Sequence, residues 1–257
     1  MMQFKILGCG SSMGVPRPDG DFGNCDPKEI KNHRTRCSAL IKTKKMNILI
    51  DTSPDLRIQL LKNKIKKIDK VLFSHMHADQ THGINDLRVF FIKSKKTIPV
   101  YADTFTSKYL TKTFSYCFKK SFNEYPAILN IIKLKKRIHF KKDGENIIIR
   151  PIKVKHGKVD SICYIINEKV AYISDVSEIR KKDLNYFKNL KYLIIDCLWY
   201  KKHPSHLNLE ESLNLIKFLK PKNAILTNLH SELDYNKLKK LLPHNVSPAF
   251  DGLTINF

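Results

Sequence analysis

Long apolar stretches are missing from this 257-residue sequence. No run reaches about eighteen apolar residues, the length that a membrane-spanning helix needs. The first residues, MMQFKILGCG, also lack the apolar core and the small-residue cleavage site of a secretory signal peptide. The sequence therefore predicts a cytoplasmic protein that does not enter a membrane.

Paired cysteines are missing as well. The six cysteines are scattered along the chain, and no two of them form a CxxC pair. This spacing argues against a disulfide framework and favours reduced thiols, which are typical of the cytoplasm.

Acidic residues are few. The chain has 24 of them against 47 lysines and arginines, which gives a formal net charge of +23. Such a charge attracts phosphates and leaves nucleic acid open as a partner. Lysine outnumbers arginine by 39 to 8, however, and isoleucine and asparagine are also abundant, a composition typical of an AT-rich genome. We therefore interpret most lysines as a solvated surface, do not favour nucleic acid, and retain an attraction to anionic substrates.

A cluster of metal-binding residue types follows a short apolar run. Residues 71–73 predict a buried strand, and His75, His77 and Asp79 come directly after it. Residues two apart point to the same side of an extended backbone, so the two imidazoles face one point, and a tight turn brings the carboxylate toward them. This pattern predicts a metal site.

The same residue types occur at the ends of several other predicted strands. These strand ends carry Asp51, His156, Asp175, Asp196 and the pair Asn228 and His230. Strand ends on one edge of a layered sheet are where sites assemble. No internal repeat or low-complexity linker is present, so we expect one domain over residues 1–257, with turns and strands in the less regular region 122–143.

The sequence resembles the metallo-β-lactamase superfamily, whose signature is HxHxDH after a strand, followed by an isolated His, an isolated Asp and a late His. Within that superfamily it is most similar to the branch of phosphoribosyl 1,2-cyclic phosphate phosphodiesterase, and the tRNA 3′-processing ribonucleases are more distant. The resemblance covers essentially the whole chain and is carried by residues 49–51, 73–83, 174–175, 206–209 and 226–227. It implies an α/β fold, a four-layer αββα sandwich with metals at one edge.

The resemblance also implies a set of metal ligands. These are His75, His77 and His156 for the first metal, with Asp175 bridging to a second metal that Asp79 also binds.

Two further aspartates are expected to support this site. Asp51 would orient a ligand imidazole by a hydrogen bond, and Asp196 either does likewise or caps a strand end. The branch often carries an extra zinc held by clustered cysteines and a late His. Here Cys25 is alone in the corresponding loop and Ser231 stands where that His would be, so we expect no such zinc.

The chain departs from the family at the second metal. Gln80 and Asn228 stand where the family has imidazoles, and a carboxamide offers a metal only a neutral oxygen. This change weakens the second site and favours harder ions. His230 and His82 lie two residues beyond these amides and are candidate substitutes, with His230 preferred over Asn228 as the late ligand. We therefore expect divalent zinc or manganese, with a firm first ion and a second ion that depends on these residues.

The expected reaction is metal-assisted hydrolysis, in which a metal-bound hydroxide attacks phosphorus. Asp79 and His206 are the predicted catalytic residues, His206 as general acid or phosphate donor because it matches the family's late histidine. His203, Arg88 and Ser11 are predicted to contact the substrate, although a structural salt bridge is the competing interpretation of Arg88.

The predicted function is a phosphodiesterase acting on a small cyclic phosphate or a nucleotide-like diester. One alternative is an RNA-processing nuclease of the tRNA 3′-end type, which is not favoured because no long basic insertion or glycine-rich RNA-clamping arm is present. Another is a mononuclear relative that no longer acts on phosphorus. Homodimers are common, so a homodimer fits, but no residue pattern indicates an interface.

Overall fold

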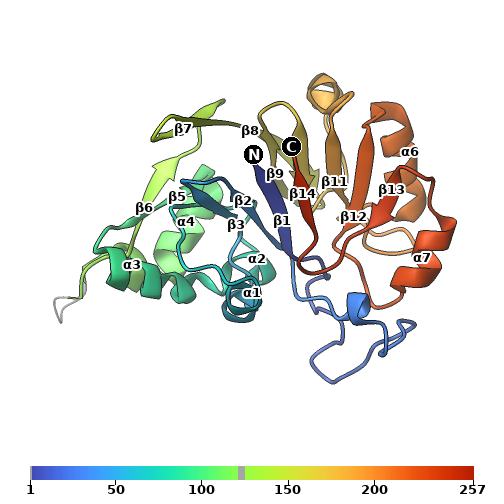
Figure 1. Cartoon of the computed structure of the whole chain (residues 1–257), viewed down its shortest axis with the longest axis horizontal. Coiled ribbons are helices and arrows are strands. Elements are labelled where there is room, and N and C mark those ends of the chain that lie inside the picture. Colours follow the sequence, from blue (N-terminus) through green and yellow to red (C-terminus); the bar gives the residue numbers. More distant parts are fainter. Residues whose placement is uncertain (1, 121–124) are drawn as a thin grey trace.

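Two β-sheets packed face to face form the centre of the molecule. The computed structural model describes residues 2–120 and 125–257. Each sheet has seven strands, and helices cover the outer face of each sheet (Figure 1). These four layers confirm the predicted αββα sandwich.

The first sheet combines the N-terminal half of the chain with its last strand. Its spatial order is β14 (Thr254–Asn256), β1 (Gln3–Gly8), β2 (Ser38–Lys42), β3 (Asn47–Ile50), β4 (Lys70–Leu72), β5 (Ile98–Ala102) and β6 (Leu129–Lys133). Strands β3 to β6 are parallel to one another, whereas β14, β1 and β2 pair antiparallel. The carboxyl ends of β3 to β6 therefore lie on one edge of the sheet.

The second sheet contains the remaining strands. Its spatial order is β13 (Val246–Pro248), β12 (Asn223–Thr227), β11 (Tyr192–Asp196), β10 (Val170–Ile173), β9 (Val159–Ile166), β8 (Glu145–His156) and β7 (Ile138–Lys142). Strands β10 to β13 are parallel, and β9 runs antiparallel to both β8 and β10. The last residue of β8, His156, therefore lies on the same edge as the carboxyl ends of β10, β11 and β12.

Short helices connect the strands. They are α1 (Leu56–Lys62), α2 (Ala78–Thr81), α3 (Arg88–Ser94), α4 (Thr104–Thr113), α5 (Ser115–Phe118), α6 (Leu209–Leu219) and α7 (Tyr235–Leu241), with 3-10 turns at Ile30–Asn32, Ile84–Leu87 and Lys181–Phe187. The first five α-helices flank the first sheet, and α6 and α7 flank the second (Figure 1). None of the helices in the described ranges has the length and apolar character needed to span a bilayer. The region expected to hold turns and strands begins at Phe122, outside the described residues, and its described part contains β6 and β7.

Alternating side chains place the core on both faces of the first sheet. In β3, Ile48 and Ile50 pack between the two sheets, whereas Leu49 packs against the helices. In β4, Leu72 faces the second sheet and Val71 faces the helices. Because both faces are covered, these strands are continuous apolar runs, and the polar residues that follow them are held rigidly at the edge.

Candidate metal centre

The turn after β4 brings the histidine cluster to the edge of the first sheet. The carbonyl of Ser74 accepts a hydrogen bond from the backbone amide of Ile162 in β9 at 2.8 Å, which ties the turn to the second sheet. His77 is the N-cap residue of α2, so Asp79 lies in the first turn of that helix. A carboxylate is favourable there because the helix N-terminus carries partial positive charge.

Three imidazoles converge at this edge. His75 Nε2 lies 2.9 Å from His77 Nδ1, and His156 Nε2 lies 3.3 Å from the same atom. His156 Nδ1 donates a hydrogen bond to the carbonyl of Ser205 at 2.7 Å, which leaves its Nε2 as an unprotonated acceptor when the ring is neutral. Burial lowers the pKa of His75 to about 3, so this ring is neutral at physiological pH. Neutral imidazole nitrogens facing one point fit a divalent cation.

The predicted contact between Asp51 and a ligand imidazole is wrong in its detail. Asp51 accepts a hydrogen bond from the backbone amide of Ser74 at 2.7 Å, and the Ser74 hydroxyl, 3.0 Å from His75 Nδ1, contacts the ring. Asp51 therefore acts on His75 through the turn. It is completely buried and has a left-handed backbone conformation, with φ at 61°, at the end of β3.

A second group of potential ligands shares His156 with the first. The donor atoms of His156, Asp175 and His206 lie within 4.8 Å of one another. His206 Nδ1 donates to the carboxylate of Asp196 at 2.7 Å, so the other ring nitrogen is free to act toward the pocket. Burial alone would lower the pKa of His206, but the Asp196 carboxylate outweighs it and raises this pKa to about 9. Asp196 therefore orients the imidazole of His206, rather than one of the three histidines expected at the first metal.

Gln80 lies between the two carboxylates expected at the second metal. Its Nε2 donates to Asp79 Oδ2 at 3.1 Å and to Asp175 Oδ2 at 3.3 Å. Its Oε1 is buried and has no hydrogen-bond partner among the described residues. A buried carbonyl oxygen without a partner is costly. Rotating the amide would turn that oxygen toward the carboxylates, so these three side chains fit a hard cation.

Asn228 contacts both His206 and the carboxylate that orients it. Its Nδ2 donates to Asp196 Oδ1 at 3.1 Å and lies 3.1 Å from His206 Nδ1. The residue is buried, and it has a left-handed conformation directly after β12, with φ at 61°. Asparagine tolerates this conformation better than most residues.

The two histidines predicted as substitute ligands do not join the cluster. His230 stacks on Trp199 with ring centroids 5.0 Å apart; its Nδ1 accepts from the Glu232 amide, and its Nε2 lies 3.5 Å from Arg17. Both of its nitrogens are thus engaged, although the ring still lines the pocket. His82 is exposed and packs against Phe114. Both predictions are wrong. The prediction for His82 required an irregular turn, but α2 continues through Thr81. The prediction for His230 required an extended backbone, but the chain turns at Asn228.

A pocket of about 270 Å³ lies over the cluster. It is lined by Asp79, Asp175, His77, His156, Asn228 and several residues from other loops, among them Ser11, His203 and His206. Met13 and Trp199 also line this pocket. Ser11, His203 and His206, which the sequence predicted to contact the substrate, all line this pocket.

The predicted substrate contact of Arg88 is wrong. Its guanidinium lies 4.3 Å from the centre of the Tyr125 ring and does not line the pocket. The competing interpretation, a salt bridge, is not seen among the described residues either. Arg88 is the first residue of α3.

Sequence reasoning missed the arginine that fixes the first loop of the pocket. Arg34 is 2% exposed. Its Nη2 donates to the carbonyl of Leu233 at 2.7 Å and to Asn32 Oδ1 at 3.0 Å, and its Nη1 donates to the carbonyl of His230 at 3.3 Å and lies 3.9 Å from Cys25 Sγ. The one signal for it is the scarcity of arginine in a chain whose basic residues are mostly lysines.

The fold and the cluster define a class of protein. Residues 46–228, more than two thirds of the chain, match the beta-lactamase superfamily domain. The chain therefore belongs to the metallo-β-lactamase superfamily, and it is a hydrolase of that fold with a histidine and aspartate cluster of the kind that holds divalent metals.

Two solved structures resemble this chain over nearly its whole length. A diphosphatase from the PhnP family has 29% sequence identity and a TM-score of 0.90, with 100% of this chain and 98% of that one covered. The likeness extends over essentially the whole length of both chains and supports the branch that the sequence resemblance indicated. Zn²⁺-bound PqqB from Methylobacterium extorquens has a TM-score of 0.77 at 16% identity, covers 99% of this chain and 100% of that one, and shows the fold alone.

One curated relative is much longer than this chain. The octanoyltransferase of Porphyromonas gingivalis is 32% identical over 258 residues, which is 98% of this chain and 51% of that protein. The chain thus spans about half the length of this relative.

Proposed function

We propose that this protein is a metal-dependent phosphodiesterase that hydrolyses a small cyclic phosphate or a nucleotide-like diester. One observation carries the proposal: His75, His77 and His156 form a group of metal-ligand donors, Gln80 joins Asp79 and Asp175 beside them, and the His206 imidazole lines the same pocket. Two cations with a proton donor beside them suit phosphoryl transfer to water. The diphosphatase at 29% identity supports a phosphorus-containing substrate.

Two sets of residues would bind the metal ions. His75, His77 and His156 would hold the first ion, while Asp175, Asp79 and the oxygen of Gln80 would hold a second. Zinc or manganese bound there would activate water for attack and neutralise charge on the phosphate oxygens.

His206 holds the proton that the leaving oxygen needs. With its pKa at about 9, the ring is protonated at neutral pH, and its Nδ1 is fixed by Asp196. The proton on Nε2 is therefore the one available to substrate. His203, whose ring centroid lies 5.2 Å from that of His206, lines the same wall.

The function is tested by turnover of bis(p-nitrophenyl) phosphate and of cyclic nucleotides with manganese or zinc. We expect hydrolysis that a chelator abolishes and that His75→Ala reduces by about 10³-fold or more. His33→Ala is the matched control, because His33 hydrogen bonds to the carbonyl of Pro27 outside the pocket. If the purified protein cleaves no phosphodiester with any divalent ion, the proposal is wrong.

We also propose a reducing, cytoplasmic location. All six cysteines are buried and unpaired in the structure. Buried free thiols are typical of proteins kept in a reducing compartment. Fractionation of cells that produce the protein tests this, and recovery from an oxidising compartment with disulfide-linked cysteines would contradict it.

A further inference from the structure

A second hollow lies beside the metal centre and is rich in lysine. It measures about 430 Å³, and its lysines come from α4, from the end of β6, from the segment after it and from β8: Lys108, Lys133, Lys135, Lys136 and Lys153. Among the described residues that line it, Asp103 is the one acid. None of these residues belongs to the pocket over the histidines.

This hollow is on the same edge of the first sheet as the metal centre. Ser74 follows β4, Asp103 follows β5 and Leu134 follows β6, and these three strands are parallel neighbours. Neighbouring strands are about 4.8 Å apart, so the end of β6 is roughly 10 Å from the end of β4. Ile162, which lines the hollow, also donates the hydrogen bond to Ser74 beside His75. A ligand of moderate length can therefore reach both places.

Among the described residues, four of the five lysines of the hollow have no carboxylate partner, whereas Lys153 has two. Asp103 is engaged as the N-cap of α4, where it accepts from the Thr106 amide at 2.8 Å, and its other oxygen is 3.7 Å from Lys153 Nζ, which also lies 3.4 Å from Asp160. Within the described ranges the other four lysines form no ion pair. The lysine-lined hollow at the opposite edge differs, because Asp69 there pairs with Lys67 at 2.7 Å and with Lys142 at 2.8 Å.

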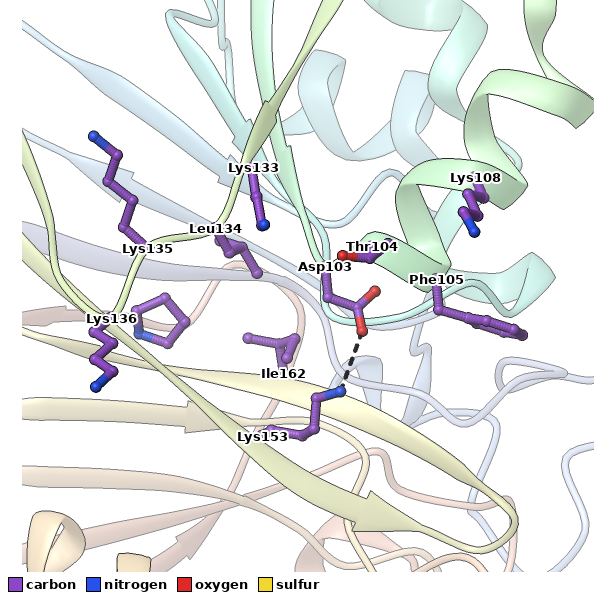
Figure 2. Close-up of a pocket in the computed structure, with 11 residues that line it drawn as sticks. Asp103, Thr104, Phe105, Lys108, Lys133, Leu134, Lys135, Lys136, Lys153 and Ile162 are labelled. Atoms are coloured by element: carbon purple, nitrogen blue, oxygen red, sulfur yellow. Dashed lines mark ion pairs between the residues drawn. The ribbon is translucent and has the colours of Figure 1, made fainter.

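The side chains are arranged around an open centre. Lys133 and Lys153 direct their ammonium groups toward the middle of the hollow, whereas Lys135 and Lys136 project outward (Figure 2). Phe105 is 61% exposed at the rim. Ammonium groups act as point charges that suit the several oxygens of a polyphosphate, and an exposed aromatic ring beside them suits a base.

We propose that this hollow binds the diphosphate or longer phosphate chain of a nucleotide, with its base against Phe105. The inference names the substrate class of the metal centre and for that step rests on the proposed function. The diester cleaved at the histidines would carry a further phosphate group roughly 10 Å away, held between Lys133 and Lys153.

Binding is tested first without metal. Calorimetry of the whole chain in EDTA at low salt uses ADP, inorganic diphosphate and AMP as probes. We expect ADP to bind more tightly than AMP, and the Lys133→Gln/Lys153→Gln double variant to weaken ADP and diphosphate roughly tenfold. Phe105→Ala should weaken ADP and leave diphosphate unchanged.

The matched control is Lys93→Gln/Lys96→Gln, which removes the same charge from exposed lysines at the opposite edge. Its binding should equal that of the unchanged protein. Equal weakening in both double variants would mean a diffuse effect of net charge, and no weakening in the first would mean that the hollow does not bind phosphate. Either result overturns the inference.

Turnover separates this inference from the proposed function. With manganese, the Lys133→Gln/Lys153→Gln variant should cleave bis(p-nitrophenyl) phosphate as well as the unchanged protein does. For a nucleotide diester with a diphosphate group its KM should rise roughly tenfold at unchanged kcat. If the double variant cleaves both substrates with the same constants as the unchanged protein, the inference is overturned and the proposed function stands. If the unchanged protein cleaves neither substrate, the proposed function is wrong, and the calorimetry alone decides whether the hollow binds phosphate.

Discussion

His206 is fixed on one side and free on the other. Asp196 accepts from its Nδ1, and Asn228 donates to the second oxygen of the same carboxylate. The carboxylate is completely buried, so it acts on the imidazole with little screening by solvent. The protonation of His206 therefore depends mainly on one neighbour.

Asp196→Asn should lower the pKa of His206 from about 9 toward or below its ordinary value of 6.5. The protonated ring exists below this pKa, so the alkaline limb of the kcat profile should move to lower pH in the variant. The measurement is kcat against pH with manganese. Asp143→Asn, an exposed carboxylate in the turn between β7 and β8, should leave the limb in place. An unmoved limb in Asp196→Asn would show that His206 is not the titrating donor.

Gln80 lies where it would determine the affinity of the second metal site. Its amide bridges Asp79 and Asp175, and only its oxygen can bind a cation. Gln80→His should tighten the weaker metal site roughly tenfold or more, because imidazole is the better ligand for zinc. Metal titration followed by calorimetry measures this, with Gln3→His as the control at the start of β1. An unchanged second affinity would mean that residue 80 does not face the metal.

The sequence located the first group of candidate ligands better than the second. His75, His77 and His156 follow from strand ends and a two-residue spacing, which fix the direction of a side chain. His230 and His82 were chosen by the same spacing rule. It failed because the chain turns at Asn228, with φ at 61°, and because α2 continues through Thr81. The role of Asn228 depends on Asp196, 32 residues away, which no local pattern reveals.

A buried guanidinium ties the long loop between β1 and β2 to the loop after β12. Arg34 bonds to the carbonyls of His230 and Leu233 in the loop after β12. Ser11 and Met13 of the same long loop line the pocket, so its position decides the shape of the site. Arg34 therefore fixes the two loops relative to each other.

Arg34→Lys should lower the free energy of unfolding by about 2–4 kcal/mol, because an ammonium cannot make the forked contacts and leaves buried carbonyls unpaired. Urea denaturation measures the change. Arg137→Lys is the control, since the Arg137 side chain is 54% exposed and its one ion pair within the described ranges is with Glu168. A loss below about 0.5 kcal/mol at Arg34 would contradict its role.

At the scale of elements, apolar runs located the strands well. Residues 71–73 were expected as a strand and β4 spans 70–72, because continuous apolar residues in short runs mark strands covered on both faces. The segment 84–92, whose apolar spacing favours one helix, divides into a 3-10 turn and α3. Its pattern of apolar residues does not distinguish the two, since both bury one side.

The net charge of +23 is spread over the molecule, and several hollows besides the metal pocket are lined by lysine. Only one of these adjoins the edge where the histidines lie, so most of the charge acts at a distance on the rate at which protein and substrate meet.

For an anionic diester we expect kcat/KM to fall roughly tenfold from low to physiological ionic strength, with kcat at saturation unchanged. Steady-state kinetics in sodium chloride, with sucrose as an uncharged control, measures both constants. A parallel fall in kcat would show that salt disturbs the site itself, and a constant kcat/KM would mean that the lysines serve solubility rather than capture of substrate.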